Sequence, residues 1–214
     1  MSVALIAGAS GLVGNHLLHL LLKNDYFTQV VSVGRRKLPV THSKLFQHIV
    51  DFENLAEESL KADHVFCCLG TTIKKAGSQE AFRKVDFTYP LELAKYGLGH
   101  GAKSFHVVTA MGAKADSKIF YSRIKGEVEE AIKALPFEQI HICRPTILLG
   151  ERNESRVAEK VAQVVTKTLG FLFIGFLKKF KGIEAKQVAI FINEISLTDQ
   201  KGIFVHSARE MQPN

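Results

Sequence analysis

The chain has 214 residues, of which 46% are hydrophobic and 23% charged, and its formal net charge is +7. This length and composition fit a single soluble globular domain, and a membrane span is excluded because no stretch approaches the roughly 20 apolar residues that a span requires. The positive charge would attract an anionic ligand, but the basic residues are dispersed without a recognition motif, so we expect no nucleic-acid partner.

The first predicted strand is an apolar run over residues 3–7, and it breaks into Gly8-x-x-Gly11-x-x-Gly14 before a helix that runs to about residue 22. Glycines allow the backbone to turn sharply and approach a pyrophosphate, and the helix N-terminus offers unpaired amide donors. The first two glycines are one residue farther apart than in the common G-x-G-x-x-G fingerprint. The stretch alone therefore indicates either a dinucleotide-binding loop or a glycine-rich turn without a ligand.

A second predicted strand, over residues 29–33, ends in Gly34-Arg35-Arg36. In a dinucleotide-binding βαβ unit this strand end lies beside the adenosine ribose, where an acid binds the 2′-hydroxyl of NAD and an arginine accepts the 2′-phosphate of NADP. No acid is present here, and Arg35 and Arg36 can form charge-assisted bonds to a phosphate. We therefore predict NADP(H) rather than NAD(H) as the cofactor. The alternative is a solvated basic turn.

A third predicted strand, over residues 45–50, is followed by Asp51. At this strand end Asp51 would lie where the adenine ring is held in such folds. It is equally a candidate for the N-cap of a helix over about residues 54–60, because aspartate often caps helices.

The fourth predicted strand, over residues 64–68, is followed by Leu69-Gly70-Thr71-Thr72. A glycine at the carboxyl end of a central strand permits close approach of the backbone to a cofactor, as in the first loop. Residues 74–75 are lysines in a predicted mobile loop. Residues 79–95 are predicted to be helical, with a break or kink near Pro90.

The fifth predicted strand ends at Thr109, and a helix begins near Phe120. On this helix Tyr121 and Lys125 are four residues apart, so a phenol and an ammonium group share one face. A free tyrosine titrates at about pH 10, and a neighbouring lysine cation would favour the phenolate that proton transfer requires. The Thr109 hydroxyl would then donate to the reacting oxygen. The alternative is an ordinary contact between Tyr121 and Lys125 on an amphipathic helix.

A sixth predicted strand, over residues 139–144, is followed by Arg152. Arg152 points either at the cofactor or substrate, or it pairs with a neighbouring acid at the surface. Residues 155–169 form a predicted helix that packs on the core or covers the substrate cleft. The apolar stretch 169–177 is either a buried connection or a partner surface.

The chain closes with a predicted helix over residues 185–195 and a terminal strand or extended arm over residues 202–206. We expect residues 1–214 to form one domain, to which residues 151–214 contribute a small substrate or partner lobe.

The cysteines are Cys67, Cys68 and Cys143, and they form no C-x-x-C pair. Their pattern favours reduced core thiols over disulfides or a zinc site, so we predict a cytoplasmic protein. The apolar start of the chain lacks the basic leading region of a signal peptide. The nine histidines show no metal-ligand spacing, and we expect no metal.

Several stretches, spread over nearly the whole chain, carry the motifs of one known enzyme group. They are Gly8-Ala9-Ser10-Gly11-Leu12-Val13-Gly14, Gly34-Arg35-Arg36, Cys67-Cys68-Leu69-Gly70-Thr71-Thr72, Tyr121-Ser122-Arg123-Ile124-Lys125, Arg144-Pro145 and Arg152-Asn153-Glu154-Ser155-Arg156. Together they resemble the short-chain dehydrogenase/reductase superfamily, specifically its small atypical branch related to the Tat-interacting-protein oxidoreductases.

The resemblance implies an α/β fold with a doubly wound parallel sheet (a Rossmann fold) and a small C-terminal helical extension over the cleft. It implies that Tyr121 is the proton donor or acceptor, that Lys125 binds the nicotinamide ribose and lowers the tyrosine pKa, and that Thr109 stands in for the catalytic serine. The cofactor-binding residues that we expect are Gly8, Ser10, Gly11, Leu12, Val13, Gly14, Arg35, Arg36, Asp51, Leu69, Gly70, Thr71, Tyr121, Lys125, Pro145 and Arg152.

The leading prediction is an NADPH-dependent reductase of a small carbonyl compound, as a monomer or dimer. The alternative is a non-catalytic NADPH-binding regulator that senses redox state and acts through a protein partner. A sugar-nucleotide epimerase is a third hypothesis, for which the region after Arg156 is short.

Overall fold

Seven parallel strands form the central sheet, in the order β3-β2-β1-β4-β5-β6-β9. The computed structural model describes residues 2–55, 60–150 and 182–212. The strands are β1 (Ser2–Ala7), β2 (Phe27–Gly34), β3 (Leu45–Ile49), β4 (His64–Cys67), β5 (Ser104–Val108), β6 (Gln139–Arg144) and β9 (Gly202–Ser207), and the short β7 (Leu148–Leu149) and β8 (Ile183–Glu184) pair separately.

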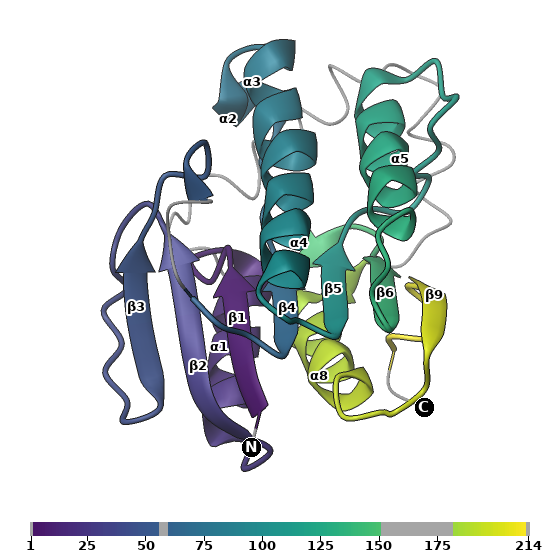
Figure 1. Ribbon diagram of the computed structural model, residues 1–214. Helices are drawn as coiled ribbons and strands as arrows, with labels where there is room; N and C mark the ends of the chain where they lie inside the picture. Colours follow the sequence, from purple (N-terminus) through teal and green to yellow (C-terminus); the bar gives the residue numbers. More distant parts are fainter. Residues whose placement is uncertain (1, 56–59, 151–181, 213–214) are drawn as a thin grey trace.

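Helices cover both faces of the sheet, which explains why the central strands are apolar without alternation (Figure 1). On one face α1 (Leu12–Lys23) packs against α8 (Ala185–Ile195), and on the other α4 (Tyr89–Gly99) packs against α5 (Phe120–Lys133). The predicted doubly wound parallel sheet is therefore confirmed. Among the described residues, no helix is both long and apolar enough to cross a membrane.

The segment between β4 and α4 differs from the prediction at its start. Residues 74–75 belong to a short helix, α2 (Ile73–Ala76), and not to a loop. The Thr72 hydroxyl accepts from the Lys75 amide at 3.2 Å, and Gly77 ends the helix at φ 84°. This N-cap and glycine C-cap stabilise a turn that has no buried side chain and therefore no apolar periodicity.

The irregularity expected near Pro90 is present as a π-helical turn. Helix α3 (Gln79–Arg83) continues through the π-helix η2 (Lys84–Thr88) into α4. Pro90 has no N–H and cannot bond to the carbonyl four residues before it, at Asp86. Single π-helical turns inside helices are common at functional sites, and this one contains the buried Asp86.

Several predicted features lie outside the described residues. They are Arg152, the helix over residues 155–169 and the apolar stretch 169–177, together with most of the helix over residues 54–60. The helix predicted over residues 185–195 and the terminal strand are both found, as α8 and β9.

A row of histidines crosses four neighbouring strands of the sheet: His64, His106, His141 and His206. The rings of His106 and His141 stack at 4.9 Å, those of His141 and His206 at 5.3 Å, and those of His64 and His106 at 6.5 Å. The Ser104 hydroxyl bonds His64 Nδ1 at 2.8 Å and His106 Nε2 at 3.0 Å, and His141 Nδ1 bonds His206 Nε2 at 3.0 Å. Burial is the main cause that lowers the pKa of each of these histidines.

We expect the protein to lose stability in mild acid because of this histidine row. In the unfolded chain these histidines bind protons below about pH 6.5, whereas in the folded protein their lowered pKa values keep them neutral to a lower pH. Their contribution to the free energy of unfolding is therefore present above about pH 6.5 and is lost as the pH falls below it. For His141 the loss continues toward the folded pKa of about 4. Each such histidine costs about 1.4 kcal/mol per pH unit between its two pKa values, which urea unfolding at about pH 7.5 and about pH 5 measures.

His206→Gln should reduce this pH dependence, and His19→Gln, on the exposed side of α1, serves as the matched control. An equal free energy of unfolding at both pH values would contradict the expectation.

Candidate functional site

The turn after β1 is fixed by close contacts between backbones. Gly8 has φ 84°, and a Cβ placed on it would lie 2.4 Å from the Cys68 carbonyl oxygen at the end of β4. A Cβ on Gly14 would lie 2.2 Å from the Gly8 carbonyl oxygen, which also accepts from the Gly11 amide at 2.9 Å. No side chain fits at Gly8 or Gly14, so the spacing of these glycines follows from the packing of β1, β4 and α1.

The N-terminus of α1 has donors to offer to an anion. Its N-cap, Gly11, has no side chain to satisfy the first amides, and the first turn holds no acid. Unpaired amides and the helix dipole together favour a phosphate at this position. Ser10 is exposed and Leu12 half-buried, whereas Val13 is buried, so Val13 can contribute only through its backbone.

The two neighbouring strand ends carry Arg35 and Asp51. Arg35 and Arg36 are exposed directly after β2, the strand beside β1. Asp51 is exposed after β3 and accepts from the Glu53 amide and the Asn54 side chain, each at 3.0 Å. The Asp51 carboxylate therefore caps the turn that follows it, and its exposed position is compatible with an adenine contact as well.

A buried ion pair lies beneath the loop that follows β4. Lys125 Nζ is 2.7 Å from Asp86 Oδ1, and the two residues are 5% and 1% exposed. Asp86 Oδ2 accepts from the Thr71 amide at 2.9 Å. A Cβ on Gly70 would lie 3.6 Å from Asp86 Oδ1 and 3.9 Å from Lys125 Nζ, so the loop backbone rests on the pair. Leu69 is half-buried in the same loop.

Burial and this ion pair together set the proton affinities of the two predicted catalytic groups. Burial lowers the pKa of Lys125, but the charges of Asp86 and Tyr121 raise it above the ordinary lysine value. Burial raises the pKa of Tyr121, against the effect of Lys125 and in the same direction as Asp86. In the structure the tyrosine pKa is thus raised, whereas the sequence predicts a lowered one. Desolvation, which a sequence motif does not report, is the cause.

Thr109 is held in a second buried polar cluster. Its hydroxyl donates to Glu129 Oε1 at 2.6 Å, and Glu129 is fully buried on α5. Arg144 Nε donates to the two Glu129 oxygens at 3.0 and 3.1 Å, and its Nη2 contacts the same carboxylate. The Thr109 proton is therefore already donated, so in this arrangement the hydroxyl can accept but cannot donate to a substrate.

The Pro145 carbonyl accepts from the Met111 amide at 2.9 Å and joins the loops after β5 and β6.

Sequence reasoning missed Asp86 and Glu129. Glu129 follows Lys125 by four residues and Tyr121 by eight, so helical spacing could have placed it on the same face. Asp86 lies four residues before Pro90, the proline that predicts the irregular turn. In neither case does the sequence show that the carboxylate is buried.

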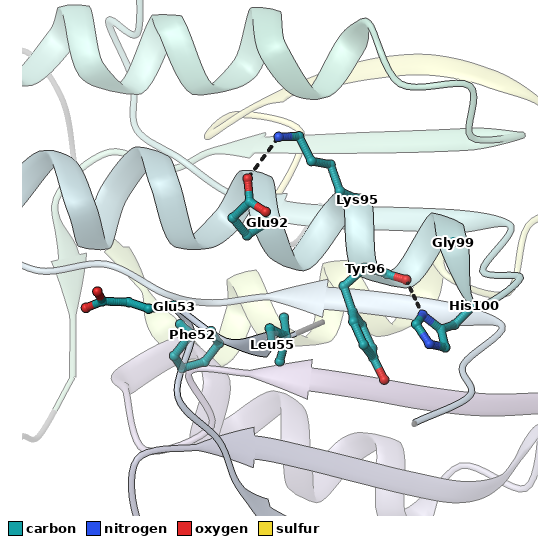
Figure 2. A pocket seen from close by; sticks show the side chains of 8 residues that line it. All are labelled: Phe52, Glu53, Leu55, Glu92, Lys95, Tyr96, Gly99 and His100. Atoms are coloured by element: carbon teal, nitrogen blue, oxygen red, sulfur yellow. Dashed lines mark hydrogen bonds and ion pairs between the residues drawn. The ribbon is translucent and has the colours of Figure 1, made fainter. Parts of the chain in front are cut away.

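A pocket of about 290 Å³ lies along α4, away from these groups (Figure 2). Its apolar wall includes Phe52, Leu55 and Tyr96, and the Lys95 ammonium and Glu92 carboxylate are paired at 2.9 Å beside it. None of the predicted catalytic residues lines this pocket. Within the described part of the chain, no group of three or more histidine, cysteine or acidic side chains is placed to hold a metal.

Comparison with known proteins shows the family of this chain. The sequence model of the NAD dependent epimerase/dehydratase family matches residues 4–169. Protein HTATIP2 of Rattus norvegicus is 39% identical over an aligned length of 164, and the alignment covers 74% of this chain and 67% of that protein. Protein FMP52-1, mitochondrial, of Scheffersomyces stipitis is 33% identical over an aligned length of 218, and the alignment covers 97% of this chain and 96% of that protein. These similarities confirm the resemblance that the motifs indicate.

Solved structures support the fold. MoeE5 in complex with UDP-glucose and NAD has a TM-score of 0.70 and 17% sequence identity, with 95% of this chain and 75% of MoeE5 covered. At this identity the similarity concerns the fold alone.

The prediction of a cytoplasmic protein is wrong. Several fungal relatives are named as mitochondrial proteins. The three cysteines are free thiols in the structure, and free thiols do not separate the cytosol from other reducing compartments.

We expect Glu129→Gln to lower the free energy of unfolding by about 1–3 kcal/mol, because it removes the charge that satisfies Thr109 and Arg144 inside the protein. Chemical denaturation measures the loss. Glu130→Gln is the matched control, since Glu130 is exposed on the same helix and should change stability by less than about 0.5 kcal/mol. Equal effects of the two substitutions would contradict a structural role for the Glu129 cluster.

Proposed function

This chain belongs to the NAD dependent epimerase/dehydratase family, and from this premise we propose that it is an NADP(H)-dependent oxidoreductase that reduces a small carbonyl compound. The observation that carries the proposal is the buried ammonium group of Lys125, one helical turn from Tyr121 and beneath the backbone of Gly70. A lysine is rarely this buried unless its charge is used or paired.

The strand order supports an extended dinucleotide along the carboxyl edge of the sheet. In the order β2-β1-β4-β5, the strand ends carry Arg35, the Gly8 turn, Gly70 and Thr109 in succession. Ligands of open α/β sheets bind outside these ends, at the point where the strand order reverses, which is here between β1 and β4. Arg35 with Arg36 would bind the 2′-phosphate, and the amides after Gly8 would bind the pyrophosphate.

The chemistry assigned to the chain is proton transfer. Bound NADPH would supply the hydride to the carbonyl carbon. The Tyr121 hydroxyl would give its proton to the carbonyl oxygen and recover one from solvent, and the Lys125 ammonium would stabilise the phenolate between these steps. Thr109 would orient the substrate oxygen only after its hydroxyl turns from Glu129, or it would keep its present role as a support of the site.

A second candidate function is an NADPH-binding regulator that acts through a protein partner. The observation that favours it is that two groups of the site are engaged by the protein itself, Lys125 by Asp86 and Thr109 by Glu129. These pairings would be compatible with a site that binds the cofactor without catalysis, because such a site needs no group that is free to donate a proton to a substrate.

We also infer a mitochondrial location, on the evidence of the names of the fungal relatives.

We expect NADPH to bind more tightly than NADH, and Arg35→Ala to weaken NADPH binding by about tenfold or more while NADH binding stays the same. The physical reason is the loss of charge-assisted bonds to the 2′-phosphate. Fluorescence titration measures both affinities. Lys23→Ala, at the opposite end of α1 from the phosphate loop, is the control for a lost positive charge. Equal binding of the two cofactors by the unaltered chain would refute the 2′-phosphate site.

We expect Tyr121→Phe to lower kcat by about 100-fold or more, because the proton donor is removed, and to weaken NADPH binding far less than it lowers kcat. The measurement is NADPH oxidation with a panel of carbonyl compounds. Tyr26→Phe is the matched control, since this partly exposed tyrosine lies beside His64 at the other end of the strands. If no compound is reduced while NADPH binds tightly, the regulator is the better description.

A further inference from the structure

Asp86 joins three parts of the site through one carboxylate. One oxygen lies 2.7 Å from the Lys125 ammonium on α5, and the other accepts from the Thr71 amide in the loop after β4 at 2.9 Å. Asp86 itself lies in the π-helical turn η2 and is 1% exposed. The same side chain therefore sets the distance between the loop and helix α5.

The buried ammonium group of Lys125 is paired with this carboxylate. A buried ammonium is unfavourable without a partner, and burial alone drives lysine toward its neutral form. The other ionisable groups that act on Lys125 are Tyr121 on its own helix and Cys67 on β4. Burial raises the pKa of Cys67 to about 12 and that of Tyr121 above its ordinary value, so both are neutral near pH 7. Of these groups only Asp86 is a carboxylic acid, and it is the one paired with the ammonium group at 2.7 Å.

We propose that Asp86 is a positioning residue that keeps Lys125 protonated and anchored beneath the Gly70 loop, so that a charged donor is in place before cofactor and substrate arrive. This inference rests on the proposed function and names a residue that the Tyr-x-x-x-Lys motif does not contain. If Asp86 had only a structural role, its hydrogen bond from the Thr71 amide would matter and its negative charge would not. An asparagine can keep that bond, which separates the two roles.

The experiment compares Asp86→Asn with the unaltered chain by the pH titration of the Lys125 side chain. Proteins with ¹³C-labelled lysine Cε are titrated by NMR, and Lys125→Met assigns the signal. Asp86→Asn should lower the titration midpoint of Lys125 by about one pH unit or more, because the opposite charge is gone and the burial remains. Asp63→Asn is the matched control, since Asp63 also accepts from a backbone amide, that of Val3, at the opposite end of β4.

Asp86→Glu keeps the negative charge and should restore the high midpoint. A midpoint that is the same in the unaltered chain and in Asp86→Asn would overturn the proposal. If the asparagine variant does not fold, the unaltered chain decides, because a Lys125 midpoint below about 10 there would show that Asp86 does not hold the charge.

NADPH titration of the same samples keeps this test apart from that of the function. In Asp86→Asn, Lys125 should lose its charge as the pH rises through its lowered titration midpoint, so NADPH binding should weaken there. Over the same pH values, NADPH binding by the unaltered chain should not change. A chain that fails to bind NADPH at any pH would refute the proposed function and leave the lysine titration as it stands.

Discussion

The close approach of two backbones, at Gly8 and at the Cys68 carbonyl, is the constraint on which the rest of the site depends. It brings the ends of β1 and β4 so near to each other that no side chain fits between them. The first turn of α1 is then directed at the same edge of the sheet as the Gly70 loop. An amide-lined turn and a buried ammonium group thus come to lie at neighbouring strand ends, although they are far apart in the sequence.

Helix α5 is attached to this edge by two buried charges of opposite sign. Lys125 is neutralised by Asp86 from η2, and Glu129 by Arg144 from β6. Each pair needs its partner, because a single charge in the interior would cost several kcal/mol. The face of α5 that carries Tyr121 is therefore fixed by electrostatics as well as by the apolar residues Ile124, Val128 and Ile132.

The strands, the glycine turn and α8 could be predicted because each depends on a local pattern. Residues 139–144 and 185–195 have the predicted bounds in the structure, since an apolar run or a helical period specifies them without reference to the rest of the chain. Asp86 could not be predicted, because its burial results from contacts with residues distant in sequence. The raised pKa of Tyr121 has the same origin, since desolvation depends on the whole fold.

The hydrogen bonds of the histidine row limit which ring nitrogen of each histidine can carry the proton. A hydroxyl has one proton, so Ser104 can donate to only one of His64 and His106 and must accept from the other. Likewise only one of His141 and His206 can donate to its neighbour when both are neutral. The tautomers are thus linked within each hydrogen-bonded group, which is His64 with Ser104 and His106, or His141 with His206. The nitrogen that carries the proton in one ring determines whether the other ring donates or accepts in the hydrogen bonds that join them. Substitution of a single histidine would then remove this constraint on the tautomer of an imidazole on the next strand, without any movement of the backbone.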